Sequence, residues 1–339
     1  MKRFLIMLFV LIPVVVLTKC RLIVHDPGLP NPTSITKFSQ TEFVPTLENK
    51  LAENKNIIYS SSLLYAWQVV KQTFNPSLIL NNPNASDFRL MNESTSFNNS
   101  LNKGEIRTEA SFGERTIDIR AFFNKELLFP SKLQKIDEGI LFDKRKVAAF
   151  GMKEVDEKIT NFTQIAFYRD DDNFIIELTP KDTLNSIVIA KGLQNVKTLA
   201  DAVKQTNVFI EKGNHEKLNP KMAWKYKFDA DDEFSIPIVR FNIEANYKNI
   251  AGQTFLVAGK KYTIETAYQR TGLTLDENGG VVESEARVTS STDSTGVTEK
   301  VHPKNMAFNR PFFIIIKRVG GTNPYFVMKV DNAELLKKI

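Results

Sequence analysis

The chain has 339 residues, a hydrophobic content of 42% and 25 phenylalanines, enough apolar material for one large domain or two ordinary ones. The single cysteine, Cys20, excludes an internal disulfide. The net charge of +6 comes from lysines that alternate with acids along the chain, without the clustered basic face that nucleic-acid binding requires. We therefore expect no nucleic-acid partner.

The first residues have the pattern of a secretory signal. A basic start, Met1 to Arg3, precedes an apolar run over 4–17, which is shorter than the roughly 20 residues of a membrane-spanning helix. The sequence thus predicts a signal peptide over 1–19 and a secreted or extracytoplasmic chain. Residues 17–20 also loosely resemble a bacterial lipoprotein box, although Lys19 stands where that box has a small residue. Cys20 is either incidental or the lipidated anchor of a membrane-bound lipoprotein, and both alternatives stay open.

Helical patterns come early in the chain. Residues 20–35 are rich in proline, show no periodicity and predict an extended lead-in. Residues 43–51 and 62–74 are predicted to be helical, the second because Leu63, Ala66, Trp67 and Val70 recur at helical spacing. The serines at 60–62 are expected to supply N-cap oxygens for that helix. The Asn- and Ser-rich segment 75–102 predicts loops with a short helix.

From residue 116 onward the patterns predict β-strands. The expected strands are 117–122, 146–152, a hairpin of 161–168 and 173–178, then 186–190, 236–247, 254–257, 261–275, 312–319 and 325–330. One helix interrupts them, with Asn195 as its predicted cap and Val196, Leu199 and Val203 on one face. The order predicts an α+β fold, with helices early and a mostly antiparallel sheet later.

Residue patterns of catalytic and metal sites are missing from the sequence. His25, His215 and His302 are scattered, no serine lies in a nucleophile elbow, and no Gly-rich loop could hold a phosphate. The acidic run 229–233 begins like a calcium loop, but Phe234 and Arg240 stand where that loop needs glycine and glutamate. We therefore expect a solvated turn there, no metal, no cofactor and no enzymatic activity.

A long polar segment lies between Leu275 and Phe308. It consists mostly of Ser, Thr, Glu and Gly, and strand-like runs lie on both sides of it. Structureless loops longer than about 12–15 residues are uncommon in compact domains and are usually functional or disordered. The pattern predicts an exposed loop over about 278–307 that is held at both ends.

Several blocks of the sequence, taken in order, resemble landmarks of the serpin family. They are 56–60 (NIIYS), 120–125 (RAFFNK), 147–152 (VAAFGM), 236–244 (IPIVRFNIE), 275–279 (LDENG), 308–313 (FNRPFF) and 326–330 (FVMKV). The chain departs from the family pattern at Ser61, Leu63, Arg120 and Lys329, which stand where the family has proline, serine, asparagine and glycine. The match is weakest over 75–110, where the family has several more helices.

The resemblance implies a single serpin-like domain over 36–339, with N-terminal helices, a large and mostly antiparallel central sheet and an exposed reactive-centre loop. Such a protein is a monomeric inhibitor of a serine or cysteine protease. The protease cleaves the loop, and the N-terminal part of the loop then inserts into the central sheet and carries the trapped enzyme along. The resemblance places Ser60 in the shutter, where the sheet opens. It places the hinge on Glu277, Asn278, Gly279, Gly280, Val281, Val282, Glu283, Ser284, Glu285 and Ala286.

The hinge departs from the small residues that the family uses there. Glu283 and Glu285 share one face of an extended strand, while Val282, Ser284 and Ala286 share the other. If the face of Val282 turns inward, both glutamates stay in solvent. The opposite register buries unpaired charges at a cost of several kcal/mol and stalls insertion.

The site of cleavage follows only from family spacing. Counting from Glu277 places the scissile bond near Asp293 and Ser294, whereas a shifted register would use Arg287 or Lys300 for a trypsin-like enzyme. The alternatives to an inhibitor are a non-inhibitory serpin-like binding protein and a surface lipoprotein.

Overall fold

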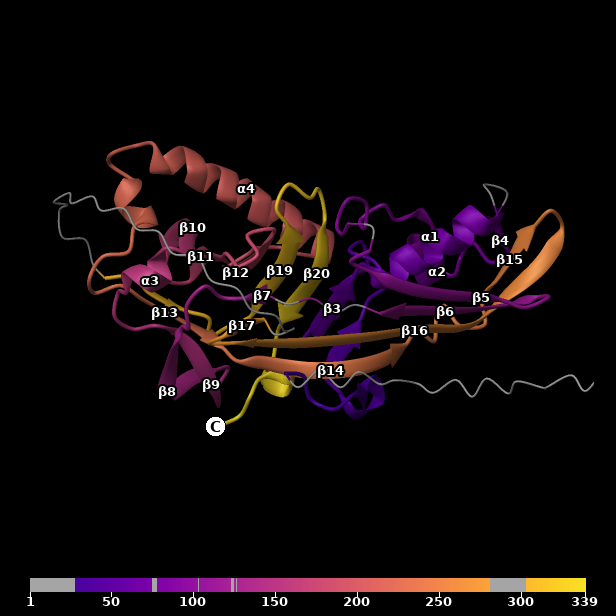
Figure 1. Cartoon of the computed structure of the whole chain (residues 1–339), viewed down its shortest axis with the longest axis horizontal. Coiled ribbons are helices and arrows are strands. Elements are labelled where there is room, and N and C mark those ends of the chain that lie inside the picture. Colours follow the sequence, from indigo (N-terminus) through magenta and orange to yellow (C-terminus); the bar gives the residue numbers. More distant parts are fainter. Residues whose placement is uncertain (1–27, 75–77, 103, 123–124, 126, 281–302) are drawn as a thin grey trace, which may run out of the picture.

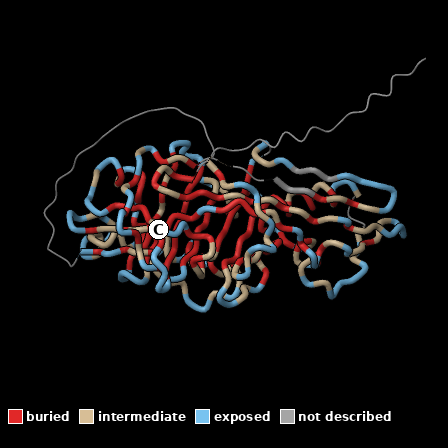
Figure 2. The backbone as a smooth tube through the Cα atoms, turned by 90° about the horizontal axis from the view of Figure 1, so that it is seen from below, coloured by how far each residue is buried: buried red, intermediate tan, exposed pale blue. Residues whose placement is uncertain are grey.

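The computed structural model describes residues 28–74, 78–102, 104–122, 125, 127–280 and 303–339, and these residues contain three β-sheets. The predicted signal peptide, Cys20 and residues 281–302 of the predicted loop lie outside these ranges. Within the described ranges, no helix is long and apolar enough to cross a membrane. Buried residues fill the interior of the sheets and exposed residues lie mainly at turns (Figure 2).

The largest sheet, called the central sheet below, has nine described strands, and its strands β14 and β16 run along the length of the molecule (Figure 1). The path β1-β14-β16-β15-β4 is extended by β6 and β5 beside β16, and by β17 and β7. The strands are β1 (Thr33–Ser34), β4 (Ile79–Leu80), β5 (Arg107–Phe112), β6 (Thr116–Phe122), β7 (Leu127–Leu128), β14 (Val239–Asn246), β15 (Thr254–Val257), β16 (Lys260–Asp276) and β17 (Gly279–Gly280). Most pairs are antiparallel, as predicted, but β1 with β14 and β6 with β16 are parallel.

Two helices pack near one end of the central sheet. They are α1 (Ser62–Phe74), which contacts β5, β6 and β16, and α2 (Ser86–Glu93). Trp67 of α1 is fully buried and makes edge-on contacts with the rings of Phe88 and Phe255. The helix over 62–74 and the short helix within 75–102 are thus confirmed. These are the two helices described between residues 62 and 102, so this region is poor in helices, as the weak match over 75–110 indicated.

Two expectations for this region are wrong. Residues 43–51 form no helix, because Thr46 bonds to Asn49 Oδ1 and the backbone of Leu47 and Leu51 bonds to residues 197–200 instead. The predicted N-cap oxygens are not used either. Ser60 Oγ and Ser62 Oγ bond to each other, and Ser61 Oγ is buried with no hydrogen-bond partner among the described residues.

The second sheet has seven described strands in the order β10-β11-β12-β19-β20-β3-β2. They are β2 (Thr41–Phe43), β3 (Asn56–Ser60), β10 (Thr163–Asp170), β11 (Asn173–Leu178), β12 (Asn185–Lys191), β19 (Phe312–Arg318) and β20 (Pro324–Val330), and they confirm the predicted hairpins. Helix α4 (Leu199–Lys217) covers one side of this sheet (Figure 1). Its cap is Thr198, which forms a capping box with Asp201. Asn195, the predicted cap, instead lies three residues earlier in a left-handed turn with φ of 54°.

The third sheet has the order β18-β13-β9-β8. Its strands are β8 (Gln134–Phe142), β9 (Arg145–Met152), β13 (Glu233–Pro237) and β18 (Asn305–Ala307). The remaining described elements are short helices: α3 (Glu157–Thr160), η1 (Ile35–Lys37), η2 (Ala223–Tyr226) and η3 (Ala333–Leu335). The predicted strand 236–247 is two strands, β13 here and β14 in the central sheet. The break follows Pro237, which has no N–H to donate. The α+β class predicted from the sequence is confirmed.

Candidate functional site

The chain reverses at the end of β16 and starts a new strand inside the central sheet. Gly279 and Gly280 of β17 pair antiparallel with Asp276 and Leu275 on one side. On the other side they pair antiparallel with β7. A Cβ on Gly279, whose φ is 122°, would lie 2.4 Å from the carbonyl oxygen of Leu127, so this position requires glycine. The first residues beyond the turn are therefore already a sheet strand.

Beyond Gly280, the next strand beside β16 on this side of the central sheet is β6. β6 pairs directly with β16 in parallel, from Thr116 beside Thr263 to Phe122 beside Arg270. A longer β17 would run antiparallel to β16 toward this pair. It could be accommodated only if β6 and β16 separated.

The turn that precedes β17 is fixed by Glu277. Its side chain is 6% exposed, and its carboxylate lies 3.0 Å from Lys135 Nζ and 3.9 Å from Lys132 Nζ. The hydrogen bond from Lys135 to this carboxylate raises the pKa of the lysine. The Glu277 carbonyl accepts the Leu133 N–H at 2.8 Å, and the Asn278 carbonyl accepts the Phe129 N–H at 2.9 Å. The start of the predicted hinge is thus attached to the connection between β7 and β8.

The described chain resumes at residue 303, and the next residue, Lys304, belongs to a buried ion pair. Lys304 Nζ lies 2.5 Å from Asp232 Oδ2, and both side chains are almost fully buried. Asp232 also accepts the backbone N–H groups of Lys304 and Asp229. An acid of the run 229–233 is therefore paired with Lys304. No cluster able to bind a metal ion occurs among the described residues.

The structure describes both ends of the predicted loop and the first four residues of the predicted hinge. Glu277, Asn278, Gly279 and Gly280 lie together at the turn and in β17. The expectation that the exposed loop spans 278–307 is wrong at both ends, because 279–280 and 305–307 are strands. The remaining hinge residues, Val281 to Ala286, and the scissile candidates Arg287, Asp293, Ser294 and Lys300 lie outside the described residues.

Ser60 lies in a buried polar cluster between β16, β3 and α1. Its Oγ is 3.1 Å from Ser62 Oγ. Gln269 Nε2 donates to Ser62 Oγ at 2.6 Å and to the Ser60 carbonyl oxygen at 3.3 Å, and Gln269 Oε1 accepts the Tyr247 hydroxyl at 2.5 Å. This polar cluster, made of Ser60, Ser62, Gln269 and Tyr247, links β16 to the start of α1.

Sequence reasoning missed Ser62, Gln269 and Tyr247. The sequence of β16 did contain an indication of Gln269, because alternate residues of this strand point to the interior. Ala267, Leu273 and Leu275 follow this alternation, and Gln269 and Thr271 occupy two buried positions in the same series. Buried polar side chains normally find hydrogen-bond partners. Gln269 has them, whereas Thr271 Oγ1 has none among the described residues.

Comparison with known proteins gives matches only among solved structures, since no family model and no curated protein matches the chain. A serpin from Schistosoma mansoni is 15% identical, with a TM-score of 0.37, over 65% of this chain and 56% of that one. Tengpin, a thermophilic serpin in its native state, is 14% identical, with a TM-score of 0.36, over 86% of this chain and 72% of that one. Manduca sexta serpin-12 is 12% identical, with a TM-score of 0.37, over 66% of this chain and 57% of that one.

The matched region spans 55% of a Tenebrio molitor serpin and 56% of the Schistosoma mansoni protein. With TM-scores below 0.5, these matches carry no conclusion about activity, target or partner. The sequence blocks that resemble serpins lie on or next to β3, β6, β9, β13, β14, β16, β17, β19 and β20, on both sides of the predicted loop. The solved structures named above are likewise serpins, and the serpin-like fold remains the prediction made from the sequence blocks.

Proposed function

We propose that the protein is an exported inhibitor of a serine or cysteine protease, and that it traps the enzyme by inserting its cleaved loop into the central sheet. The observation that carries this proposal is β17, a strand that begins the loop and already lies between β16 and β7. Cleavage within 281–302 would free the chain after β17 to extend this strand between β16 and β6.

The register of β17 decides which hinge side chains would point inward. Each further residue of β17 would pair one residue further back along β16, so Val282, Ser284 and Ala286 would lie beside Leu273, Thr271 and Gln269. These three residues of β16 are buried. Cross-strand neighbours share a face of the sheet. The apolar and small side chains of the hinge would therefore enter the interior.

The same register keeps both hinge glutamates on the outer face. Glu283 would lie beside Gly272 and Glu285 beside Arg270, two residues of β16 that are only partly buried. A carboxylate opposite an arginine on a sheet surface stabilises the pair by roughly 0.2–1 kcal/mol. Of the two registers considered from the sequence, this one avoids burial of unpaired charge.

Insertion would also improve the hydrogen bonding of the sheet. The parallel pair of β6 and β16 would give way to two antiparallel pairs, and parallel pairing is slightly less stable per residue. Ser284 would enter beside Thr271, whose buried hydroxyl has no hydrogen-bond partner among the described residues. The buried polar cluster around Ser60 lies beneath the strand that would have to move, which supports its role as the shutter.

The remaining features of the proposal rest on the amino-acid sequence alone. The protein would be a secreted monomer, or a lipoprotein anchored to a membrane through Cys20. The scissile bond would lie at Asp293–Ser294, with Arg287 or Lys300 as the alternatives for a trypsin-like target. The bulky Val281 and Val282 favour slow insertion, which leaves a non-inhibitory serpin-like binding protein as the second candidate.

The proposal is tested by incubating the protein with a panel of serine and cysteine proteases and running the products on a denaturing gel. We expect a covalent complex with at least one active protease and none with the same protease after active-site blockage. Cleavage within 281–302 without a complex for any protease would contradict inhibition and favour the second candidate.

A further inference from the structure

A cavity of about 370 Å³ opens at one end of the seven-stranded sheet. It lies where β12 ends and β19 begins, next to the segment that leads into α4. Its lining consists of Asp172, Asn173, Lys191, Gly192, Leu193, Gln194, Val196, Arg310, Pro311, Phe313 and Lys329. This volume suits a small organic molecule, since ligand cavities usually measure about 300–1,000 Å³.

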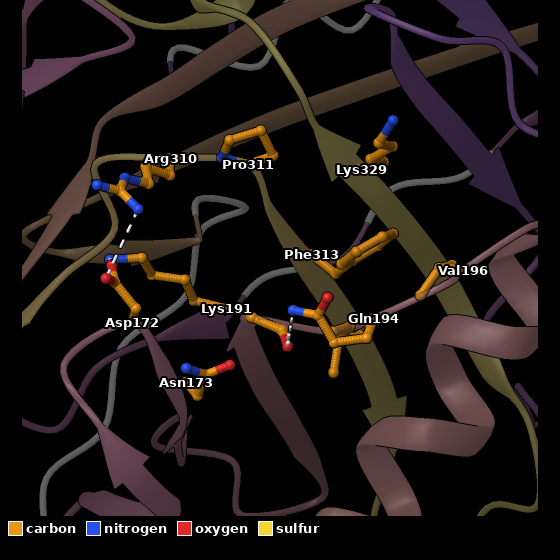
Figure 3. A pocket seen from close by; sticks show the side chains of 11 residues that line it. Asp172, Asn173, Lys191, Gln194, Val196, Arg310, Pro311, Phe313 and Lys329 are labelled. Carbon is orange, nitrogen blue, oxygen red and sulfur yellow. Dashed lines mark hydrogen bonds and ion pairs between the residues drawn. The ribbon is translucent and has the colours of Figure 1, made fainter.

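The lining combines an apolar surface with a charged end. In Figure 3, Pro311 and Phe313 lie between Arg310 on one side and Lys329 on the other, with Val196 near Gln194. The Lys329 ammonium is paired with Asp331 at 3.1 Å, so its charge is largely compensated. The charge that could act on a ligand is therefore at the end that contains Arg310.

At that end, two cations share one carboxylate. Asp172 Oδ1 lies 3.0 Å from Lys191 Nζ, and Asp172 Oδ2 lies 3.6 Å from Arg310 Nη1. Lys191 is 4% exposed and also donates to the carbonyl oxygen of Ala307 and to Asn309 Oδ1. Among the residues that line this end of the cavity, the two cations Lys191 and Arg310 face the single carboxylate of Asp172.

Arg310 is the group in this cavity best able to meet an anion. Its side chain is 70% exposed, and its contact with Asp172 is long and uses one nitrogen. A guanidinium carries five N–H donors in a planar fork, which matches the oxygens of a carboxylate or sulfonate. An anion at this position would also lie close to the positive charge of the buried Lys191.

We propose that this cavity binds a small amphipathic organic anion. Its flat apolar part would lie against Pro311, Phe313 and Val196, and its carboxylate or sulfonate group would bind Arg310. This site is independent of protease inhibition, because it uses no residue of the hinge, of the buried polar cluster or of the loop.

The test compares two probes that share an apolar body and differ in charge. 8-Anilinonaphthalene-1-sulfonate is the anion, N-phenyl-1-naphthylamine is its uncharged counterpart, and both are titrated by fluorescence. Two variants address the charged end: Arg310→Gln removes the cation, and Gln194→Glu places a negative charge on the lining. Their matched controls are Arg240→Gln and Gln164→Glu, the same changes at exposed positions outside the cavity.

We expect the anionic probe to bind the unaltered protein more tightly than the neutral probe. Arg310→Gln should weaken binding of the anionic probe roughly tenfold, the effect of losing one charge-assisted hydrogen bond. Gln194→Glu should weaken it by a similar factor, because its carboxylate would repel the anion. Neither variant should change binding of the neutral probe, and neither control should change either probe. Equal affinity for the two probes, no binding of the anionic probe, or equal losses in variants and controls would overturn the proposal.

Discussion

Gln269 of β16 donates a hydrogen bond to Ser62 Oγ, at 2.6 Å, and this contact ties the strand that pairs with β6 to the first residue of α1. The same amide accepts the hydroxyl of Tyr247, which comes from the connection between β14 and β15. Three separate parts of the chain thus meet at one side chain. Gln269 also pairs with Ala121 of β6, so any separation of β6 from β16 would open the sheet at a residue of this cluster.

Replacing Gln269 by leucine should destabilise the protein. The apolar side chain fills a similar volume but leaves the Tyr247 hydroxyl buried without its acceptor. We expect a loss of about 1–3 kcal/mol in the free energy of unfolding, measured by urea denaturation. Gln164→Leu, the same change at an exposed position of β10, should stay within about 0.5 kcal/mol of the unaltered protein. Equal effects of the two changes would show that the amide of Gln269 contributes nothing specific.

Replacing Glu277 by glutamine should loosen the hinge turn. The change keeps the shape of the side chain but removes the charge that faces Lys135 and Lys132. We expect a lower melting temperature than for the control Glu93→Gln, which removes an exposed ion-pair partner from α2. Strong salt should weaken this difference, since the two lysines are exposed. A melting temperature unchanged by Glu277→Gln would contradict the fixed turn.

Alkaline pH should destabilise the protein through its buried tyrosines. Burial raises the pKa of Tyr247, and of Tyr59 and Tyr325, above the ordinary value of 10.0. The folded state therefore keeps protons that the unfolded chain releases, so the stabilisation is present below about pH 10 and is lost as the pH rises further. Melting temperatures should fall steeply above about pH 10, and less steeply in Tyr247→Phe. Identical slopes for the two proteins would show that Tyr247 ionises equally in both states.

The register of β17 predicts opposite outcomes for charges on the two faces of the hinge. Replacing both Glu283 and Glu285 by alanine should change inhibition little, because both would stay on the outer face. Ser284→Glu should reduce covalent complex formation at least roughly tenfold, because burial of an unpaired carboxylate costs several kcal/mol. The yield of complex on a denaturing gel measures both effects. Improved inhibition by the double alanine variant would indicate the opposite register.

Much of this fold follows from periodicity, and the parts that do not are those that depend on distant contacts. Helix α1 was predictable because Leu63, Ala66, Trp67 and Val70 recur at helical spacing. The hairpin of β19 and β20 was predictable from runs of apolar residues, and the long β16 from a strand-like series rich in threonine and tyrosine. Residues 43–51 also look helical, but their backbone hydrogen bonds are made with residues 197–200, which no local pattern can show.

The hinge was predictable only in part. Glu277 and the glycines stood out because they matched a family pattern. The strand β17 was not predictable, since two glycines show no hydrophobic periodicity. They form a strand only because β16 and β7 lie on both sides of them. Lys132 and Lys135 could not be assigned to Glu277 either, because more than 140 residues separate them in the sequence.

The most direct test of loop insertion is the melting temperature of the protein after cleavage within 281–302. Trypsin can cut this segment at Arg287 and Lys300, and mass spectrometry would verify the cut; protein treated with blocked trypsin is the control. Insertion predicts that the cleaved protein melts at least about 10 °C higher than the control, because an added central strand should stabilise the sheet by several kcal/mol. A verified cut at Lys300 with an unchanged or lower melting temperature would contradict insertion and, with it, the proposed mechanism of inhibition.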